Sequence, residues 1–368
     1  MMKAVSVIKD VPKEVSKFVP QRLPPMPSFK DLLRIYGVRS KKQLSQNFLM
    51  NGHSTRELVE RCQLKPDHTV VEIGPGPGNI TREILAMGPR ELFVIEKDRR
   101  FLPILEMLAD AAHPGQMKII IGDALDYSLN NFFHPALKRE WEDDPPPIHF
   151  VGNLPFNIST PLLIRWLRQM HSRTGPFAYG RVPLNLTFQW ELAVRICSDV
   201  MEPPRNRLSA IVQMFSVPKR KLRIFGRNFY PKPEVDTGLV QLKPRYKPIV
   251  PLDIPFETID KLTRCMFHLR FASVRKSCRI LFPRSEYHLV EEMFRQTIVE
   301  PDDNAMMLSC EEISEVIQAY WKMVKDEPFL RDYCHTAPKR EPKLLRDMFS
   351  ETGLTPKKGF RREINLNE

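Results

Sequence analysis

The protein has 368 residues, of which 42% are hydrophobic and 27% charged, a composition typical of a soluble globular protein with room for two domains. Its 56 lysines and arginines exceed its 44 acidic residues and give a net charge of +12 at pH 7, which indicates a polyanionic partner, most often nucleic acid. Composition argues against a membrane-spanning protein, since no apolar run approaches the roughly 20 residues that cross a bilayer, and against a structural metal, since the six scattered cysteines form neither a CxxC pair nor a zinc spacing.

Residues 1–27 are predicted to form a leader ahead of the folded part. They carry five basic side chains among apolar ones, as in a mitochondrial presequence, but Asp10 and Glu14 are unusual in such a signal. From the residues alone, an import signal and a disordered leader are both open. The proline-rich stretch 22–27 cannot be helical throughout, and Ser28 after it can cap a helix through Ile35.

The segment 42–49 precedes the first predicted strand. Gln46 and Asn47 could close over a bound ligand, with Phe48 wedged against it. The other interpretation is a turn between two amphipathic helices, and the residues alone slightly favour it.

From residue 69 onward, strand-like and helix-like stretches alternate. Short apolar runs predict strands over 70–73, 92–95, 117–121 and 148–151, with a helix over 79–87 after the first. This alternation predicts an α/β fold with a Rossmann-like parallel sheet covered on both faces. A glycine or polar element follows each strand directly, at the edge of the sheet where open parallel sheets bind ligands.

The loop Gly74-Pro75-Gly76-Pro77-Gly78 follows the first of these strands. Its glycines let the backbone pass close to a ligand, although a tight strand-to-helix turn without a ligand is the alternative. The third glycine comes one residue earlier than in G-x-G-x-x-G, which counts against a dinucleotide and leaves room for a smaller adenosyl ligand.

Two acids follow the next two strands. Glu96 lies about 20 residues after the glycine loop, where an acid accepts both ribose hydroxyls; alone, it would be an ordinary solvated acid. Asp123 could accept from the amine of a cofactor adenine, with the Ala124 backbone framing the ring edge, or it could form an Asx turn.

The fourth strand ends in Asn153-Leu154-Pro155-Phe156. An adenine amine is a poor nucleophile because its lone pair is delocalised into the ring. The Asn153 side-chain carbonyl and the Leu154 backbone carbonyl could accept from its N–H bonds, favour a pyramidal nitrogen and free that lone pair. Pro155 stiffens the turn and Phe156 offers a stacking face. A strand-end turn in which the proline and the ring merely pack is the alternative.

The second half of the chain begins with an insert, 138–147, predicted to be an exposed loop with solvated acids and extended prolines. Further strands are predicted over 184–188, 211–217 and 239–242, with a helix through 191–196. Four prolines within 243–255 place a domain boundary there. Helical periodicity follows to about residue 335, and the residues from 336 to 368 are predicted to be a basic flexible tail.

These motifs, in this order, resemble the family of rRNA adenine dimethyltransferases that use S-adenosylmethionine. The resemblance covers about residues 22–330, and the joint occurrence of its motifs is highly specific. Two stretches, 141–146 and 175–181, resemble the mitochondrial branch of that family, and the intact Asn153–Phe156 loop favours the first of its two types. The signatures are Gln46-Asn47-Phe48-Leu49, Glu72-Ile73-Gly74-Pro75-Gly76-Pro77-Gly78, Glu96-Lys97-Asp98, Gly122-Asp123-Ala124-Leu125, Asn153-Leu154-Pro155-Phe156 and Phe229-Tyr230-Pro231-Lys232-Pro233-Glu234-Val235.

The resemblance implies a methyltransferase domain over 28–246, a smaller helical RNA-binding domain over 256–335, and no metal. It implies that Asn153, Leu154, Pro155 and Phe156 hold the target adenine. It also implies that the S-adenosylmethionine site is lined by Gln46, Asn47, Phe48, Leu49, Gly74, Gly76, Glu96, Lys97, Asp123, Ala124 and Asn153.

The implied function is dimethylation of the N6 amines of two adjacent adenines in the 3′-terminal stem-loop of mitochondrial small-subunit rRNA, in the matrix and in support of subunit assembly. Basic residues would grip the RNA backbone, although any one of them could be a solvated surface charge. The candidates are Arg205, Arg207, Lys219, Arg220, Lys221 and Arg223 in the first domain and Arg270, Arg275, Lys276 and Arg279 in the second.

Two other functions compete with this one. A non-catalytic accessory factor of mitochondrial transcription would use the basic surface on DNA, but would have no need of the intact Asn153 loop. A nicotinamide-dependent oxidoreductase is disfavoured by the glycine spacing and by the same loop.

Overall fold

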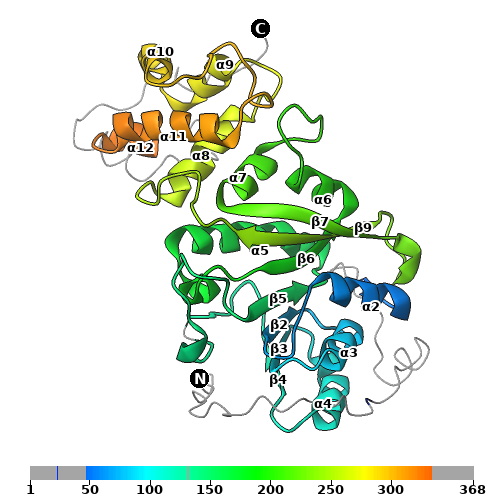
Figure 1. Ribbon diagram of the computed structural model, residues 1–368. Coiled ribbons are helices and arrows are strands. Elements are labelled where there is room, and N and C mark those ends of the chain that lie inside the picture. Colours follow the sequence, from blue (N-terminus) through cyan, green and yellow to red (C-terminus); the bar gives the residue numbers. More distant parts are fainter. Residues whose placement is uncertain (1–22, 24–46, 131, 334–368) are drawn as a thin grey trace, which may run out of the picture.

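The computed structural model describes residue 23 and residues 47–130 and 132–333. The predictions for the leader, for Gln46, for a helix after Ser28 and for the basic tail lie outside the described residues. Within them the fold is a central sheet with helices on both faces, followed by a cluster of helices, as the sequence predicted (Figure 1).

The sheet has seven strands in the order β4-β3-β2-β5-β6-β9-β7. The first five strands in this order are parallel, and the last two pairings, β6 with β9 and β9 with β7, are antiparallel. The structure confirms the predicted strands over 70–73, 92–95, 117–121, 148–151, 184–188 and 239–242. They read as apolar runs because strands of a sheet covered on both faces are buried on both sides. The strands are β2 (Thr69–Ile73), β3 (Glu91–Glu96), β4 (Met117–Ile121), β5 (Ile148–Gly152), β6 (Leu184–Gln189), β7 (Ser216–Ile224) and β9 (Thr237–Pro244).

Helices cover the two faces of this sheet, and successive strand residues point alternately to each. Val70 packs with α2 (Gly52–Arg61), α3 (Asn79–Ala86) and α4 (Leu102–Ala111), whereas Val71 packs with the other face. That second face is covered by α5 (Phe156–Ser172), α6 (Trp190–Ile196) and α7 (Arg207–Phe215). The predicted helices over 79–87 and 191–196 are therefore confirmed.

The predicted strand over 211–217 is wrong. The chain is helical in α7 through Phe215, and β7 begins only at Ser216. A short apolar run fits either a strand or a buried helix. The local signal that decides the matter is a capping box, in which Asn206 and Ser209 each accept from the backbone of the other and begin the helix.

The C-terminal helices pack directly against the sheet part, since one continuous apolar core includes residues from both. The predicted helical character of this region is confirmed, while the domain bounds 28–246 and 256–335 stay predictions. The helices are α8 (Phe256–Met266), α9 (Val274–Cys278), α10 (His288–Arg295), α11 (Cys310–Val324) and α12 (Pro328–Asp332). None of the helices within the described residues is long and apolar enough to span a membrane.

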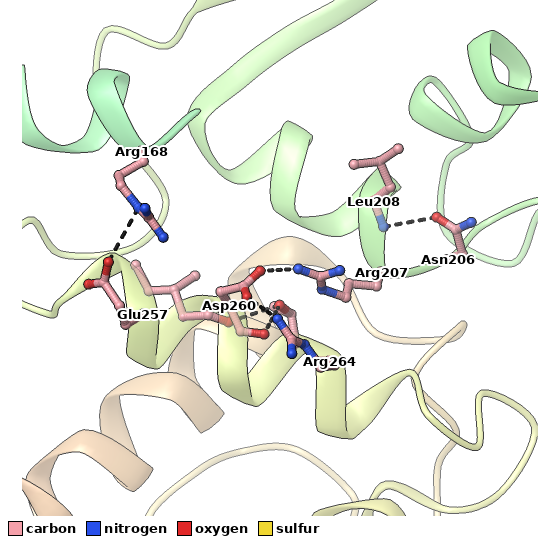
Figure 2. A network of polar contacts seen from close by, with 9 residues as sticks. Arg168, Asn206, Arg207, Leu208, Glu257, Asp260 and Arg264 are labelled. Atoms are coloured by element: carbon pink, nitrogen blue, oxygen red, sulfur yellow. Dashed lines mark hydrogen bonds and ion pairs between the residues drawn. The ribbon is translucent and has the colours of Figure 1, made fainter. Parts of the chain in front are cut away.

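Ion pairs join α5 and α7 to α8 at this junction. Figure 2 shows Asp260 of α8 between Arg207 of α7 and Arg264 one turn further along α8; the Arg264 pair measures 2.6 Å. Arg168 of α5 pairs with Glu257 at 3.3 Å, and its guanidinium lies over the ring of Phe256. Arg207, a candidate for gripping RNA, is thus engaged in holding the two parts together.

Arg205 is not available to RNA, which corrects its prediction. The residue is 0% exposed, and its guanidinium donates to the Leu308 carbonyl at 2.9 Å and the Ser198 carbonyl at 3.4 Å. It connects the loop before α7 with the start of α11. A buried arginine that donates to backbone carbonyls of distant residues leaves no trace in the local sequence pattern.

The insert 138–147 is only partly the exposed loop that was predicted. Its acids, including Glu142 and Asp143, are exposed, but Trp141 is 5% exposed and belongs to the core. The Trp141 indole N–H donates to the backbone carbonyls of Arg245 and Tyr246 at 3.0 and 3.1 Å. The tryptophan therefore anchors the insert beside the end of β9.

Candidate active site

The carboxyl ends of β2, β3 and β5 meet at one cavity. The space between its lining atoms amounts to about 660 Å³, part of it open solvent. Residues from five of the six signature motifs line it together. The lining residues are Asn47, Phe48, Leu49, Gly74, Pro75, Gly76, Pro77, Asn79, Ile80, Glu96, Asn153, Leu154, Pro155, Phe156 and Phe229.

The glycine loop forms one wall of the cavity. No side chain could replace its glycines without strain. Gly74, Gly76 and Gly78 have φ of 69°, 54° and 80°, the left-handed region that L side chains avoid. A Cβ on Gly76 would lie 3.1 Å from the ring of Phe48, and one on Gly78 would lie 2.5 Å from Leu108. At its glycine positions the loop therefore presents bare backbone to the cavity.

Glu96 is held against this loop at the end of β3. One carboxylate oxygen accepts from the Gly76 amide at 3.0 Å and the other from the Asp98 amide at 2.7 Å. The side chain is buried, and burial raises the pKa of Glu96. Because a carboxylate oxygen can accept more than one hydrogen bond, Glu96 can also accept from hydroxyl groups of a ligand.

The amide of Asn153 is fixed on both sides. Its Nδ2 donates to the Asn47 carbonyl at 3.2 Å, and its Oδ1 accepts from the Thr187 hydroxyl at 2.8 Å. The hydroxyl has no other partner among the hydrogen bonds of the described residues, and together the two contacts define which end of the amide is oxygen. Asn153 Oδ1 keeps one lone pair for a ligand in the cavity.

Asn47 and Phe48 reach the cavity through long-range strand pairing. Phe48–Leu49 form β1, which pairs antiparallel with β8 (Phe229–Tyr230). The favoured interpretation of this segment, a turn between two helices, is therefore wrong for Phe48 and Leu49. Phe48 stacks edge-on against Phe101, with ring centroids 5.4 Å apart, and so closes the cavity over the glycine loop.

Lys97, Asp123 and Ala124 were predicted to line the cofactor site, but they lie beside the cavity wall. Lys97 Nζ pairs with Asp123 at 2.5 Å, and Asp123 also accepts from the Leu125 amide at 2.9 Å, which is the Asx turn weighed as its alternative. Burial alone would raise the pKa of Asp123, but its bonds with Lys97 and Leu125 outweigh burial and lower it. The end of β4, which precedes Asp123 and Ala124, stays close to the end of β3, because the Gly122 amide donates to the Glu96 carbonyl at 2.9 Å.

Sequence reasoning missed three polar residues around the cavity. Thr187 lies inside β6 and reads as a buried strand residue. Asn79 lines the cavity, and its buried Oδ1 has no partner among the described residues; its place directly after the glycine loop was the available signal. Glu72 of β2 is 1% exposed, and neither carboxylate oxygen meets the hydrogen-bond criteria with another described residue; burial raises its pKa to about 8, although the nearby Thr81 hydroxyl opposes this.

Comparison with known proteins identifies the family of this chain. A family model described as ribosomal RNA adenine dimethylase matches residues 37–321. The protein named dimethyladenosine transferase 1, mitochondrial, from Xenopus laevis is 40% identical over 334 residues, which cover 90% of this chain and 95% of the relative. Its namesake from Homo sapiens is 39% identical over 313 residues, covering 85% and 90%. These matches confirm the resemblance to the mitochondrial branch.

Solved structures support the fold. A dimethyladenosine transferase from Plasmodium falciparum matches with a TM-score of 0.59 at 20% identity, covering 75% of this chain and 98% of that one. The 23S rRNA methyltransferase ErmE matches with a TM-score of 0.50 at 21% identity, covering 74% and 98%. At these identities the likeness concerns the fold alone.

Proposed function

The chain belongs to the ribosomal RNA adenine dimethylase family, and we propose that its substrate is a pair of adjacent adenines in the 3′-terminal stem-loop of mitochondrial small-subunit rRNA. It is an S-adenosylmethionine-dependent rRNA adenine dimethyltransferase of mitochondria. We place its action in the matrix, in support of small-subunit assembly. The observation that carries the site assignment is the fixed amide of Asn153, a residue that lines the cavity and whose Oδ1 has a lone pair to spare.

The cavity fits S-adenosylmethionine in three respects. Glycines at positions 74 and 76 leave backbone where a Cβ would be strained or would crowd Phe48. Asn79 Oδ1 is an unpartnered buried acceptor on the wall, suited to a ligand that donates hydrogen bonds. Glu96 would bind the ribose hydroxyls. When bound, the cofactor supplies a methyl group made electrophilic by its sulfonium.

The residues after β5 would hold and activate the target amine. Asn153 Oδ1 and the Leu154 carbonyl would each accept one N–H bond, which favours a pyramidal nitrogen with an available lone pair. Pro155, whose φ is −53°, stiffens the loop, and Phe156 at the start of α5 provides a stacking face. Positioning the amine in line with the methyl carbon supplies most of the catalysis, and no strong base is required because the amine becomes acidic only after methylation.

The target base must leave its stack to enter the cavity, which costs less in a hairpin loop than in a duplex. The helical part next to the sheet would help to enclose the rigid stem. Of the cations proposed there, Arg275 is paired with Glu291 and Asp302, and Arg270 donates to backbone carbonyls. Lys276 and Arg279 are exposed and are therefore the better candidates for phosphate contacts.

Purified protein with labelled S-adenosylmethionine and the rRNA hairpin tests the activity and the site together. Asn153→Ala should abolish most transfer, a loss of about 100- to 1000-fold, and should only partly weaken cofactor binding. Asn130→Ala, which truncates an exposed asparagine outside the cavity wall, is the matched control and should retain activity. Full activity of Asn153→Ala would refute the assigned role.

Mass spectrometry of small-subunit rRNA from cells depleted of this protein tests the substrate. We expect loss of dimethyladenosine at two adjacent positions in the 3′-terminal stem-loop. Persistence of dimethyladenosine there would refute the substrate while leaving the family's general activity intact.

A further inference from the structure

Arginine and aromatic side chains alternate at the free edge of the sheet. The guanidinium carbons of Arg220 and Arg223, both on β7, lie 5.5 and 4.6 Å from the ring centroid of Trp190. Arg223 and Arg227 lie 5.5 and 5.0 Å from the ring centroid of Phe225. The series Arg220–Trp190–Arg223–Phe225–Arg227 is called the arginine–aromatic ladder below.

The ladder is open to solvent. Phe225 is 46% exposed, the Arg223 side chain is 48% exposed, and Arg220 and Arg227 are exposed as well. Trp190 is half-buried, and its ring packs closely over Gly238 of β9, where an added Cβ would lie only 3.2 Å from the ring. The sheet therefore supports the indole from below, while the outer parts of the series face water.

The ladder carries an excess of positive charge. Among the described residues, only one of its three guanidinium groups has a carboxylate partner: Arg223 pairs with Asp236 at 2.8 Å. No ion pair is recorded for Arg220 or Arg227 within the described residues. Core packing does not require three cations interleaved with two rings, whereas an anionic partner with flat rings would match both features.

The ladder lies at the same end of the strands as the target-adenine loop, namely the carboxyl end of β5 and β6. Thr187, which holds Asn153, is in β6 only three residues before Trp190, about 10 Å along the chain. β7 runs parallel to β6, since each is antiparallel to β9, so its end with Arg223 reaches the same edge. The chain from Phe225 leads directly into β8, whose Phe229 lines the cavity.

Resting on the proposed function, the geometry points to the ladder as a platform for the unpaired nucleotides next to the target adenine. Their bases stack on the exposed parts of Trp190 and Phe225, and their phosphates contact Arg220 and Arg227. Stacking of this kind requires unpaired bases, because the faces of bases in a closed duplex are covered by their neighbours. The ladder thus selects a loop over a stem and fixes the direction in which the strand leaves the cavity.

Abasic substitution in the rRNA hairpin tests this platform directly. An abasic site beside the target adenine removes one base and keeps its phosphate. In wild type we expect this change to raise Kd for the hairpin about tenfold, and Phe225→Ala or Trp190→Ala to do the same with the intact hairpin. When the abasic hairpin is tested with either variant, the two effects on Kd should not add, because both changes remove the same stacking contact. Equal effects of the abasic site in wild type and in both variants would overturn the inference.

The cationic members of the ladder have a separate signature. Gln at both position 220 and position 227 (Arg220→Gln with Arg227→Gln) should weaken binding of intact and abasic hairpins alike, and should reduce the slope of log K against log salt concentration by about two. The charge-matched control is Lys65→Gln with Lys138→Gln, two exposed cations on loops that precede β2 and β5 in the chain, outside the helical part. A slope reduced equally by the control would contradict a specific role for the ladder.

Fluorescence separates this inference from the proposed activity and guards against misfolding. A stacked base should quench Trp190 without any cofactor present, and Trp190→Phe should abolish the quenching while keeping hairpin affinity within about threefold, since a phenyl ring still stacks. Phe225→Ala removes an exposed ring and should leave Tm unchanged. If wild type binds the hairpin with quenching but transfers no methyl group, the proposed function fails and the platform stands. If it transfers methyl groups and shows no quenching, only the platform fails.

Discussion

The two halves of the cavity are built from different chemistry. The cofactor half, formed by the ends of β2 and β3, consists of strained glycine backbone and the buried carboxylate of Glu96. Glu72 is buried in β2 two residues before the glycine loop, and burial raises the pKa of both carboxylates. The target half, after β5, has no titratable side chain among Asn153–Phe156 and depends on one amide held between Asn47 and Thr187. The difference shows that each half can be disabled separately, and by different means.

The largest expected effect concerns the pH dependence of the cofactor half. Glu72 has a pKa of about 8 in the folded protein against 4.5 unfolded, so the folded state binds more protons between these values and stability falls as pH rises through that window. The free energy of unfolding should drop by about 4 kcal/mol between pH 5 and pH 9 through this one group. Glu72→Gln should remove that loss, as measured by denaturant unfolding of the cofactor-free protein.

Glu60→Gln on the exposed face of α2 is the control for this experiment and should leave the wild-type pH dependence in place. An unchanged pH dependence in Glu72→Gln would show that the buried carboxylate is not the cause.

The next effect concerns the target half. Thr187→Val keeps the shape of the side chain and removes the donor to Asn153 Oδ1, so the amide loses the contact that fixes its orientation. We expect kcat for methyl transfer to fall about 10- to 100-fold, with the Kd for cofactor within about threefold of wild type. Thr187→Ser restores the hydroxyl and should restore most of the rate. A general packing defect would instead lower Tm in both variants and would not be rescued by serine.

The smallest of these effects concerns the glycine loop. Gly76→Ala places a methyl group 3.1 Å from the Phe48 ring in a backbone conformation with φ of 54°. A left-handed alanine costs about 1–2 kcal/mol, so we expect cofactor affinity to fall about tenfold. Binding of the rRNA hairpin without cofactor should be unchanged, as measured by titration. A parallel loss of hairpin affinity would mean that the two halves are not separable.

The sequence predicted much of the fold because this sheet leaves a strong local record. Strands buried on both faces read as apolar runs, and each polar element that follows one lies at the same edge. On that basis the sequence alone predicts that Glu96, the glycine loop and the Asn153 loop lie together at the carboxyl ends of the strands. Lys97 and Asp123 follow the same rule and lie nearby, yet they pair with each other outside the cavity wall, because position along a strand does not determine which way a side chain turns.

What the sequence could not predict depends on contacts between distant segments. The two-residue strand at Phe48 exists only through its partner at Phe229–Tyr230, and Thr187 gains its role only because β6 lies beside β5. Arg205 has the composition of an RNA-binding residue and the burial of a core residue, since its partners are carbonyls from residues 198 and 308. The wrong strand over 211–217 is an error of a different kind, because a local signal, the capping box at Asn206, indicates the helix that ends at Phe215.

The most direct test of the account is a crystal structure with S-adenosylhomocysteine bound. We expect its ribose at Glu96 and its sulfur within about 8 Å of Asn153 Oδ1, the summed span of a carbon–sulfur bond, a near-attack contact and one hydrogen bond. A sulfur bound farther away, or a ligand bound outside this cavity, would contradict the claim that methyl donor and target amine meet at the end of β5.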